Sequence, residues 1–237
     1  MPAAEQQISS GVDPAAVIPF LRRLLGRVLA PAGMQWLDQE LDRQRSGLDE
    51  RRLAIALGLA TRKVGRMDLA PPPDEVAAAE RLRPRWQPQL WGTDEAARVA
   101  LVLATYRADD KAFAARIDRL CATGELTEQV AYLKGFAIFP AAGALHDRAR
   151  EAVRSSIAPV FEAIACGNPY PHDHFDESAW NQMVVKCVFS GLPIASIVGL
   201  RERRNGELIA MLRDLVSERT AAGRATPDEV HGFIAGG

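Results

Sequence analysis

The sequence predicts an all-α protein, an antiparallel array of about ten helices. Apolar residues recur at helical spacing along most of the chain, whereas no stretch alternates apolar and polar residues between turn signals, as a strand does. Proline, glycine and capping residues separate the helical stretches by short loops, which place successive helices side by side. A compact bundle or a HEAT-like α-solenoid fits this pattern, although the chain has no clean repeat period.

The first third of the chain contains four expected helices. Pro14, at a first-turn position, begins the first helix after residues 1–13, which we expect to be a flexible tail. The expected helices run from Pro14 to the break at residues 30–33, then over residues 34–44, 48–64 and 74–83.

A proline-rich segment, residues 71–91, separates these helices from the rest of the chain. It could be a linker between two domains, or a strap that lies across a single domain formed by residues 14–237. We favour the strap, because Trp86, Leu90 and Trp91 need an apolar surface to pack against.

The remaining helices follow capping residues and prolines. Thr93 is expected to cap one helix and Asp109 the next, because their side-chain oxygens can accept from free N–H groups of the first turn. The later helices are expected over residues 125–139, over residues 146–157, after Pro159, after Asp176 or Ser178, over residues 201–222, and after Pro227.

Composition excludes several classes of function. The chain has 237 residues and a net charge of −1, and only 6% of its residues are aromatic, so neither a basic face nor a base-stacking surface for nucleic acid is expected. No signal peptide and no apolar run of about 18–20 residues is present, so we expect a cytoplasmic protein that does not span a membrane. Cys121, Cys166 and Cys187 lack the CxxC spacing and are expected to be buried free thiols.

Polar, aromatic and turn-forming residues gather in one stretch, residues 168–186, which reads NPYPHDHFDESAWNQMVVK. The pairs Asn168-Pro169 and Tyr170-Pro171 predict an extended entry, because a residue before proline is disfavoured in the α region. A helix then follows Asp176 or Ser178. We expect a polar site, if the protein has one, in this stretch.

The candidate site residues have two readings. If the chain is an enzyme, the candidate catalytic residues are Lys186, His172 and His174, which can exchange protons. The candidate substrate-binding residues are Asn168, Tyr170, Asp176, Trp180, Asn181, Gln182 and Asn205. The alternative is structural: the amides form a hydrogen-bond network that joins the loop to two helices, and Trp180 belongs to the core.

The same stretch also contains possible metal ligands. The imidazole and carboxylate groups there suit zinc or iron. All of them lie in one loop, whereas metal sites usually draw ligands from separate rigid elements with supporting contacts. We therefore predict no bound metal and no other cofactor. The groups considered are His172, Asp173, His174, Asp176 and Glu177.

Several segments together resemble the EboA family. They are residues 145–154, residues 157–165, the NPYP sequence of residues 168–171, Phe175, the AWNQMVVK sequence of residues 179–186, and the RRNGEL sequence of residues 203–208. The resemblance covers residues 91–237, and the first 90 residues contribute little to it. No reaction can be transferred to this chain residue by residue from the family.

The resemblance implies a role in bacterial secondary metabolism. EboA-like proteins are encoded beside a UbiA-like membrane prenyltransferase and other enzymes, in clusters that make or export a small natural product. Our first hypothesis is a protein that binds a small, partly hydrophobic metabolite or docks a pathway enzyme. The alternatives are a cofactor-independent isomerase, lyase or transferase with a helical pocket, and a structural partner of the prenyltransferase.

Overall fold

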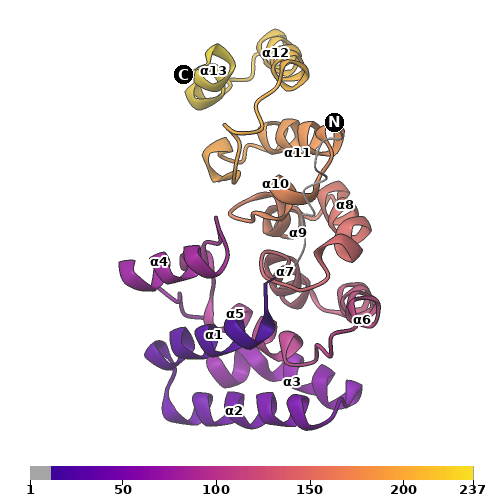
Figure 1. The fold of residues 1–237 in the computed structure, drawn as a ribbon. Coiled ribbons are helices and arrows are strands. Elements are labelled where there is room, and N and C mark those ends of the chain that lie inside the picture. Colours follow the sequence, from indigo (N-terminus) through magenta and orange to yellow (C-terminus); the bar gives the residue numbers. More distant parts are fainter. Residues whose placement is uncertain (1–11, 237) are drawn as a thin grey trace, which may run out of the picture.

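The computed structural model describes residues 12–236, which form thirteen α-helices and three short 3-10 helices, η1 to η3, without a strand (Figure 1). The all-α prediction is therefore confirmed. The α-helices are α1 (Pro14–Val28), α2 (Pro31–Ser46), α3 (Glu50–Val64), α4 (Pro73–Leu82), α5 (Thr93–Leu103), α6 (Asp110–Thr123), α7 (Leu126–Gly135), α8 (His146–Arg154), α9 (Ala158–Ala165), α10 (Tyr170–His174), α11 (Glu177–Phe189), α12 (Gly206–Ala221) and α13 (Asp228–Ala235). The 3-10 helices are η1 (Pro88–Leu90), η2 (Ala142–Leu145) and η3 (Ile194–Ser196).

The helices are stacked largely in chain order, with α1 to α3 at one end of the molecule and α12 and α13 at the other (Figure 1). The helix α5 packs against α1, α3 and α7, and α7 then packs against α9. Further along, α11 contacts α9 and α12, and α12 contacts α13. The apolar stripes that predicted the helices thus face one another in a continuous core.

The segment of residues 71–91 packs against the N-terminal helices through its tryptophans. Trp86 lies with its ring centroid 5.4 Å from that of Phe20 in α1 and 5.6 Å from that of Trp91. Both tryptophans are almost fully buried, as expected, whereas Leu90 remains 51% exposed. The tail expected for residues 1–13 lies outside the described residues, except that Asp13 caps α1 by accepting from the Ala15 N–H at 2.9 Å.

Several expected helix ends differ in the structure. Gly92, not Thr93, precedes α5, and its N–H donates to the Glu95 carboxylate. The Thr93 hydroxyl instead lies 2.9 Å from the Gly65 carbonyl, to which it donates, so it joins α5 to the end of α3. Asp109 and Asp176 do cap their helices, as predicted.

Three helices are shorter than expected, among them α7, which ends at Gly135 although the helix was expected over residues 125–139, and one break is displaced. The helix expected over residues 201–222 begins only at Gly206, because Asn205 caps it by accepting from the Leu208 N–H. The helix expected over residues 146–157 ends at Arg154. The break expected at residues 30–33 lies at Leu29 and Ala30, because Pro31 is the first residue of α2, a position at which the missing N–H of proline breaks no helical hydrogen bond.

The extended entry expected before α11 is wrong. Residues 170–174 form the short helix α10, preceded by Pro169 in α-helical conformation. Pro171 lies in the first turn, where its missing N–H leaves no helical hydrogen bond unmade. The preference of residues before proline for extended backbone was outweighed by local contacts, among them a hydrogen bond from the Tyr170 N–H to the Asn168 side chain.

Candidate functional site

Asn168 and Tyr170 use their polar groups to hold the chain at the start of α10. The Asn168 amide donates to the carbonyls of Leu133 and Ala163, each at 3.0 Å, and its oxygen accepts from the Tyr170 N–H. The Tyr170 hydroxyl donates to the Ala142 carbonyl at 2.6 Å, and burial raises its pKa. Both residues thus connect α10 to α7, α9 and η2 from within the core.

The two candidate histidines face different neighbours. The His172 ring lies edge-on to Trp180, with 6.3 Å between ring centroids, and its Nδ1 lies 2.6 Å from Asp173 Oδ1. The His174 ring lies 4.5 Å from that of Tyr170, and burial lowers the pKa of His174. The structure therefore does not bring the two imidazoles together on one site.

Asp173 and Asp176 are held by cationic or backbone groups. Asp173 accepts from Arg83 as well as contacting His172; burial raises its pKa, but these hydrogen bonds outweigh burial and hold the pKa below its usual value. Asp176 accepts from the Ala179 N–H and from Arg150. Within residues 12–236, no three His, Cys, Asp or Glu side chains are grouped so that they could hold a metal ion.

Lys186 belongs to α11, and its ammonium group lies at the C-terminal end of α8. Its ammonium donates to the carbonyls of Val153 and Ser155, each at 2.6 Å, and lies 4.3 Å from the centre of the Phe161 ring. Burial lowers the pKa of Lys186. These contacts satisfy carbonyls that a helix end leaves without intrahelical partners.

Asn181 and Asn205 form a pair of side-chain hydrogen bonds between α11 and the start of α12. The Asn205 amide donates to Asn181 Oδ1 at 2.9 Å, and the reverse bond is 3.3 Å. The sequence-based structural alternative was a wider network that also joins the loop of residues 168–171 to the two helices, and this pair joins the two helices only. Trp180 is buried next to it under the Arg203 guanidinium, 4.7 Å from the ring centre, whereas Gln182 is exposed.

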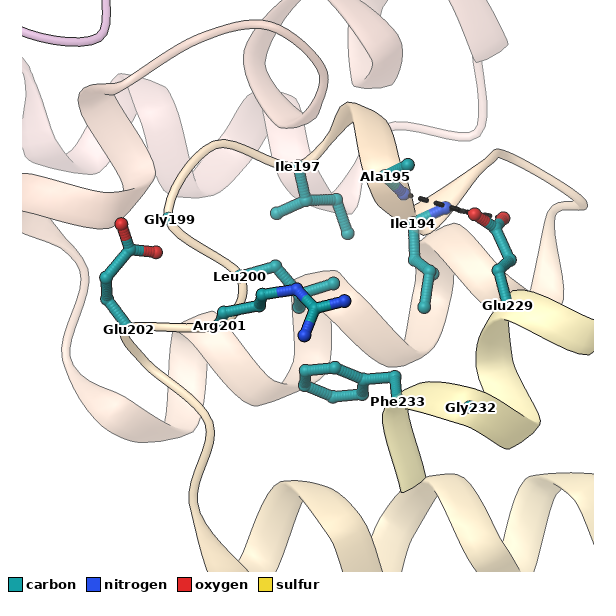
Figure 2. Close-up of a pocket in the computed structure, with 10 residues that line it drawn as sticks. All are labelled: Ile194, Ala195, Ile197, Gly199, Leu200, Arg201, Glu202, Glu229, Gly232 and Phe233. Carbon is teal, nitrogen blue, oxygen red and sulfur yellow. Dashed lines mark hydrogen bonds between the residues drawn. The ribbon is translucent and has the colours of Figure 1, made fainter. Parts of the chain in front are cut away.

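The four ligand-sized hollows identified among the described residues, of about 510, 400, 430 and 320 Å³, are not lined by any of the ten predicted site residues. The largest of the four lies farther along the chain, between η3, the loop that follows it and α13, and we call it the η3–α13 pocket (Figure 2). Its volume is about 510 Å³, within the range of roughly 300–1,000 Å³ typical of small-molecule sites. Its lining residues are Ile194, Ala195, Ile197, Gly199, Leu200, Arg201, Glu202, Glu229, Gly232 and Phe233.

The pocket combines an apolar floor with charged groups. Ile197, Leu200 and Phe233 belong to the buried core and also line the cavity. Figure 2 shows the Arg201 side chain reaching across the cavity towards Phe233. Glu229 accepts from the Ile194 N–H at 3.0 Å and, more weakly, from the Ala195 N–H at 3.4 Å, so it ties α13 to η3.

The loop that contains Gly199 and forms one wall of the pocket packs against α10. Gly199 has a φ of +75°, and a Cβ atom added there would lie 1.9 Å from Cδ2 of His172. Arg203, four residues on, donates to the carbonyls of Pro171 and His172. Residues 170–174 of the predicted polar stretch therefore contact the outer side of this loop, and their side chains do not line the pocket.

Two other hollows, of about 400 and 430 Å³, are lined by charges that pair with one another. In the first, Lys134 contacts Glu95 at 2.7 Å. In the second, Arg148 contacts Glu151 at 2.7 Å. The η3–α13 pocket is larger than either of these two hollows.

Sequence reasoning missed the η3–α13 pocket because its two walls, residues 194–202 and residues 229–233, are far apart in the chain. The available local signals were Pro193, Gly199 and Gly232, which indicate an irregular loop and a helix with an open face. Nothing local indicates that α13 folds back against that loop.

The fold and the cavity together define the class of protein. It is an all-α array of stacked helices with a ligand-sized, mainly apolar pocket near its C-terminal end. No helix among residues 12–236 is long and apolar enough to cross a membrane.

The family model described as "Metabolite traffic protein EboA" matches residues 17–235, so the chain belongs to the EboA family. This confirms the resemblance, and the match also includes most of the first 90 residues, which had contributed little to it. Comparisons with curated proteins and with solved structures found no match.

Proposed function

We propose that this protein binds a small, partly hydrophobic metabolite in the η3–α13 pocket, and that it holds or passes on this metabolite during biosynthesis or export. The observation that carries the proposal is the pocket itself, about 510 Å³ with an apolar floor. The family description, which refers to metabolite traffic, supports the same class of function.

The geometry favours binding over catalysis. Lys186 is engaged by two carbonyls, His172 lies behind Gly199, and His174 stacks on Tyr170. A general acid or base must come within hydrogen-bond reach of its substrate, and none of the three faces the pocket. The enzyme hypothesis and the docking of a pathway enzyme remain predictions without a supporting contact.

Gly232 offers a way to fill the pocket without disturbing the fold. It lines the cavity from α13, and a Cβ atom added there meets no atom within 4 Å. The substitution Gly232→Leu extends a side chain into the pocket, and it favours the helix by up to about 1 kcal/mol because glycine is a poor helix former. Gly206→Leu is the matched control, since Gly206 begins α12 in similarly open space outside the pocket.

The test is native mass spectrometry of the protein purified from the cells that naturally produce it, compared with its denatured mass. We expect the wild type and Gly206→Leu to carry an adduct with the mass of a small organic molecule, and Gly232→Leu to lack it. An adduct retained by Gly232→Leu, or no adduct on any variant after incubation with an extract of those cells, would contradict the proposal.

A further inference from the structure

Two of the three cysteines meet in the fold, although twenty residues separate them in the sequence. Cys166 directly follows α9, and Cys187 lies in α11, which packs against both α9 and η3. The side chains of the two cysteines are hydrogen-bonded to each other. Tertiary packing thus creates a pair of thiols that the sequence, which lacks a CxxC motif, does not indicate.

Hydrogen bonds of the main chain hold both cysteines in place. Gly167, the residue after Cys166, donates from its N–H to the Ser196 carbonyl of η3 at 2.8 Å. The N–H of Leu192 donates to the Cys187 carbonyl at 2.9 Å. The backbone is therefore fixed next to both thiols, which keeps the two side chains in contact.

The two thiols differ in their access to solvent. Cys187 is 0% exposed, as expected for a buried thiol, whereas Cys166 is partly exposed, contrary to the sequence-based prediction. A small reagent in solution can therefore reach Cys166 but not Cys187. Cys187 can react only with a group that is already attached to Cys166.

The hydrogen bond between the thiols gives them different roles. The Cys187 S–H donates to the Cys166 sulfur, which lowers the pKa of Cys166 although burial raises it. The same hydrogen bond and burial together raise the pKa of Cys187. The thiolate is the nucleophilic form of cysteine, so Cys166 is the thiol that attacks first, and Cys187 is the thiol that stays protonated.

We propose that Cys166 and Cys187 form a reversible redox pair, in which Cys166 attacks a small disulfide, such as glutathione disulfide, and Cys187 completes a disulfide bond within the protein. Neither cysteine lines the η3–α13 pocket, so this inference does not depend on the proposed function.

The oxidation proceeds in two exchange steps. The Cys166 thiolate attacks one sulfur of the small disulfide, forms a bond to it and releases the other half as a thiolate, which takes up a proton. The Cys187 sulfur then attacks Cys166 Sγ, and its proton passes to the second departing thiolate. The net reaction oxidises two protein thiols to one disulfide and reduces the small disulfide to two thiols, and an excess of thiol reverses it.

The experiment uses the full chain, reduced and then freed of reductant, and incubates it with glutathione disulfide. After the remaining thiols have been blocked with N-ethylmaleimide, the protein is digested with trypsin without reductant, and the peptides are identified by mass spectrometry. Trypsin cleaves after Arg154, Lys186 and Arg201, so the two cysteines fall in separate peptides, residues 155–186 and 187–201. A disulfide between the cysteines appears as a single species that contains both peptides.

We expect the wild type to give this linked species and to lose it on addition of dithiothreitol. Cys187→Ser should stop at the mixed disulfide, with one glutathionyl group on Cys166, and Cys166→Ser should leave the buried Cys187 unmodified. Cys121 is the internal control, because burial raises its pKa to about 12. It should react at least about tenfold more slowly than Cys166, since each unit of pKa changes the thiolate fraction about tenfold.

Three results would overturn the inference. They are a wild type that forms no linked species, a Cys166→Ser variant in which Cys187 reacts as fast as Cys166 does in the wild type, and oxidation of Cys121 at the rate of Cys166. Circular dichroism checks that each variant folds, and the wild-type result does not depend on any variant.

Discussion

The contact between Gly199 and His172 makes the substitution Gly199→Ala the sharpest test of how α10 supports the pocket. Gly199 has a φ of +75°, a left-handed conformation that costs a residue with a Cβ atom about 1–2 kcal/mol. The new Cβ would also lie 1.9 Å from the His172 ring, so the ring or the loop must move. Overpacking of this kind costs about 1–3 kcal/mol, which brings the expected loss of unfolding free energy to about 2–5 kcal/mol.

Gly191→Ala is the matched control for this prediction. Gly191 has the same φ of +75°, but a Cβ added there meets no atom within 4 Å. Its substitution should therefore cost only the backbone strain of about 1–2 kcal/mol. The difference between the two variants isolates the contact with His172.

The assay is urea unfolding followed by circular dichroism, for both alanine variants and for Gly199→Ala combined with His172→Ala. Removing the imidazole should recover part of the cost of Gly199→Ala, which a double-mutant cycle measures as a coupling energy. Equal destabilisation by Gly199→Ala and Gly191→Ala, or a cycle without coupling, would refute the reasoning.

Three further predictions concern single side chains. Lys186→Met should lower the unfolding free energy by about 1–3 kcal/mol, because it leaves carbonyls at the end of α8 without their donor; an unchanged urea midpoint would contradict this role. A hydrogen bond from Cys187 outweighs burial and lowers the pKa of Cys166, so its alkylation by iodoacetamide, followed by peptide mass spectrometry, should reach half its maximal rate at a pH below the usual cysteine pKa of about 8.5. Burial raises the pKa of Asp94, but hydrogen bonds from Thr61 and Arg98 outweigh burial and keep it low. The stability that Asp94 contributes is thus present above its unfolded pKa of about 3.9 and is lost as the pH falls below it, so unfolding free energies measured at pH 7 and pH 3 should differ less in Asp94→Asn than in the wild type.

Local signals predicted most of the helices. Apolar stripes indicated their inward faces, and Pro14, Asp109 and Asp176 indicated where three of them begin. The wrong helix boundaries arose at residues whose type is compatible with both helix and loop. Tyr170 was expected to be extended because Pro171 follows it, but it is the first residue of α10. The charged residues before Asn205 were expected to be helical, but they form a loop.

The candidate site was less predictable, because polar side chains in a sequence do not reveal their partners. The stretch of residues 168–186 is rich in polar groups, and in the structure most of them bind backbone groups or each other. Asn168 and Lys186, for example, donate to main-chain carbonyls. The η3–α13 pocket instead depends on the contact of α13 with a distant loop, and tertiary packing alone creates it.

The most direct test of the central claim is a crystal structure of the protein purified together with its natural small-molecule adduct. We predict electron density for the ligand in the η3–α13 pocket, next to the apolar floor of Ile197, Leu200 and Phe233. Density for the ligand elsewhere, with the pocket empty, would contradict the claim that this cavity is the binding site.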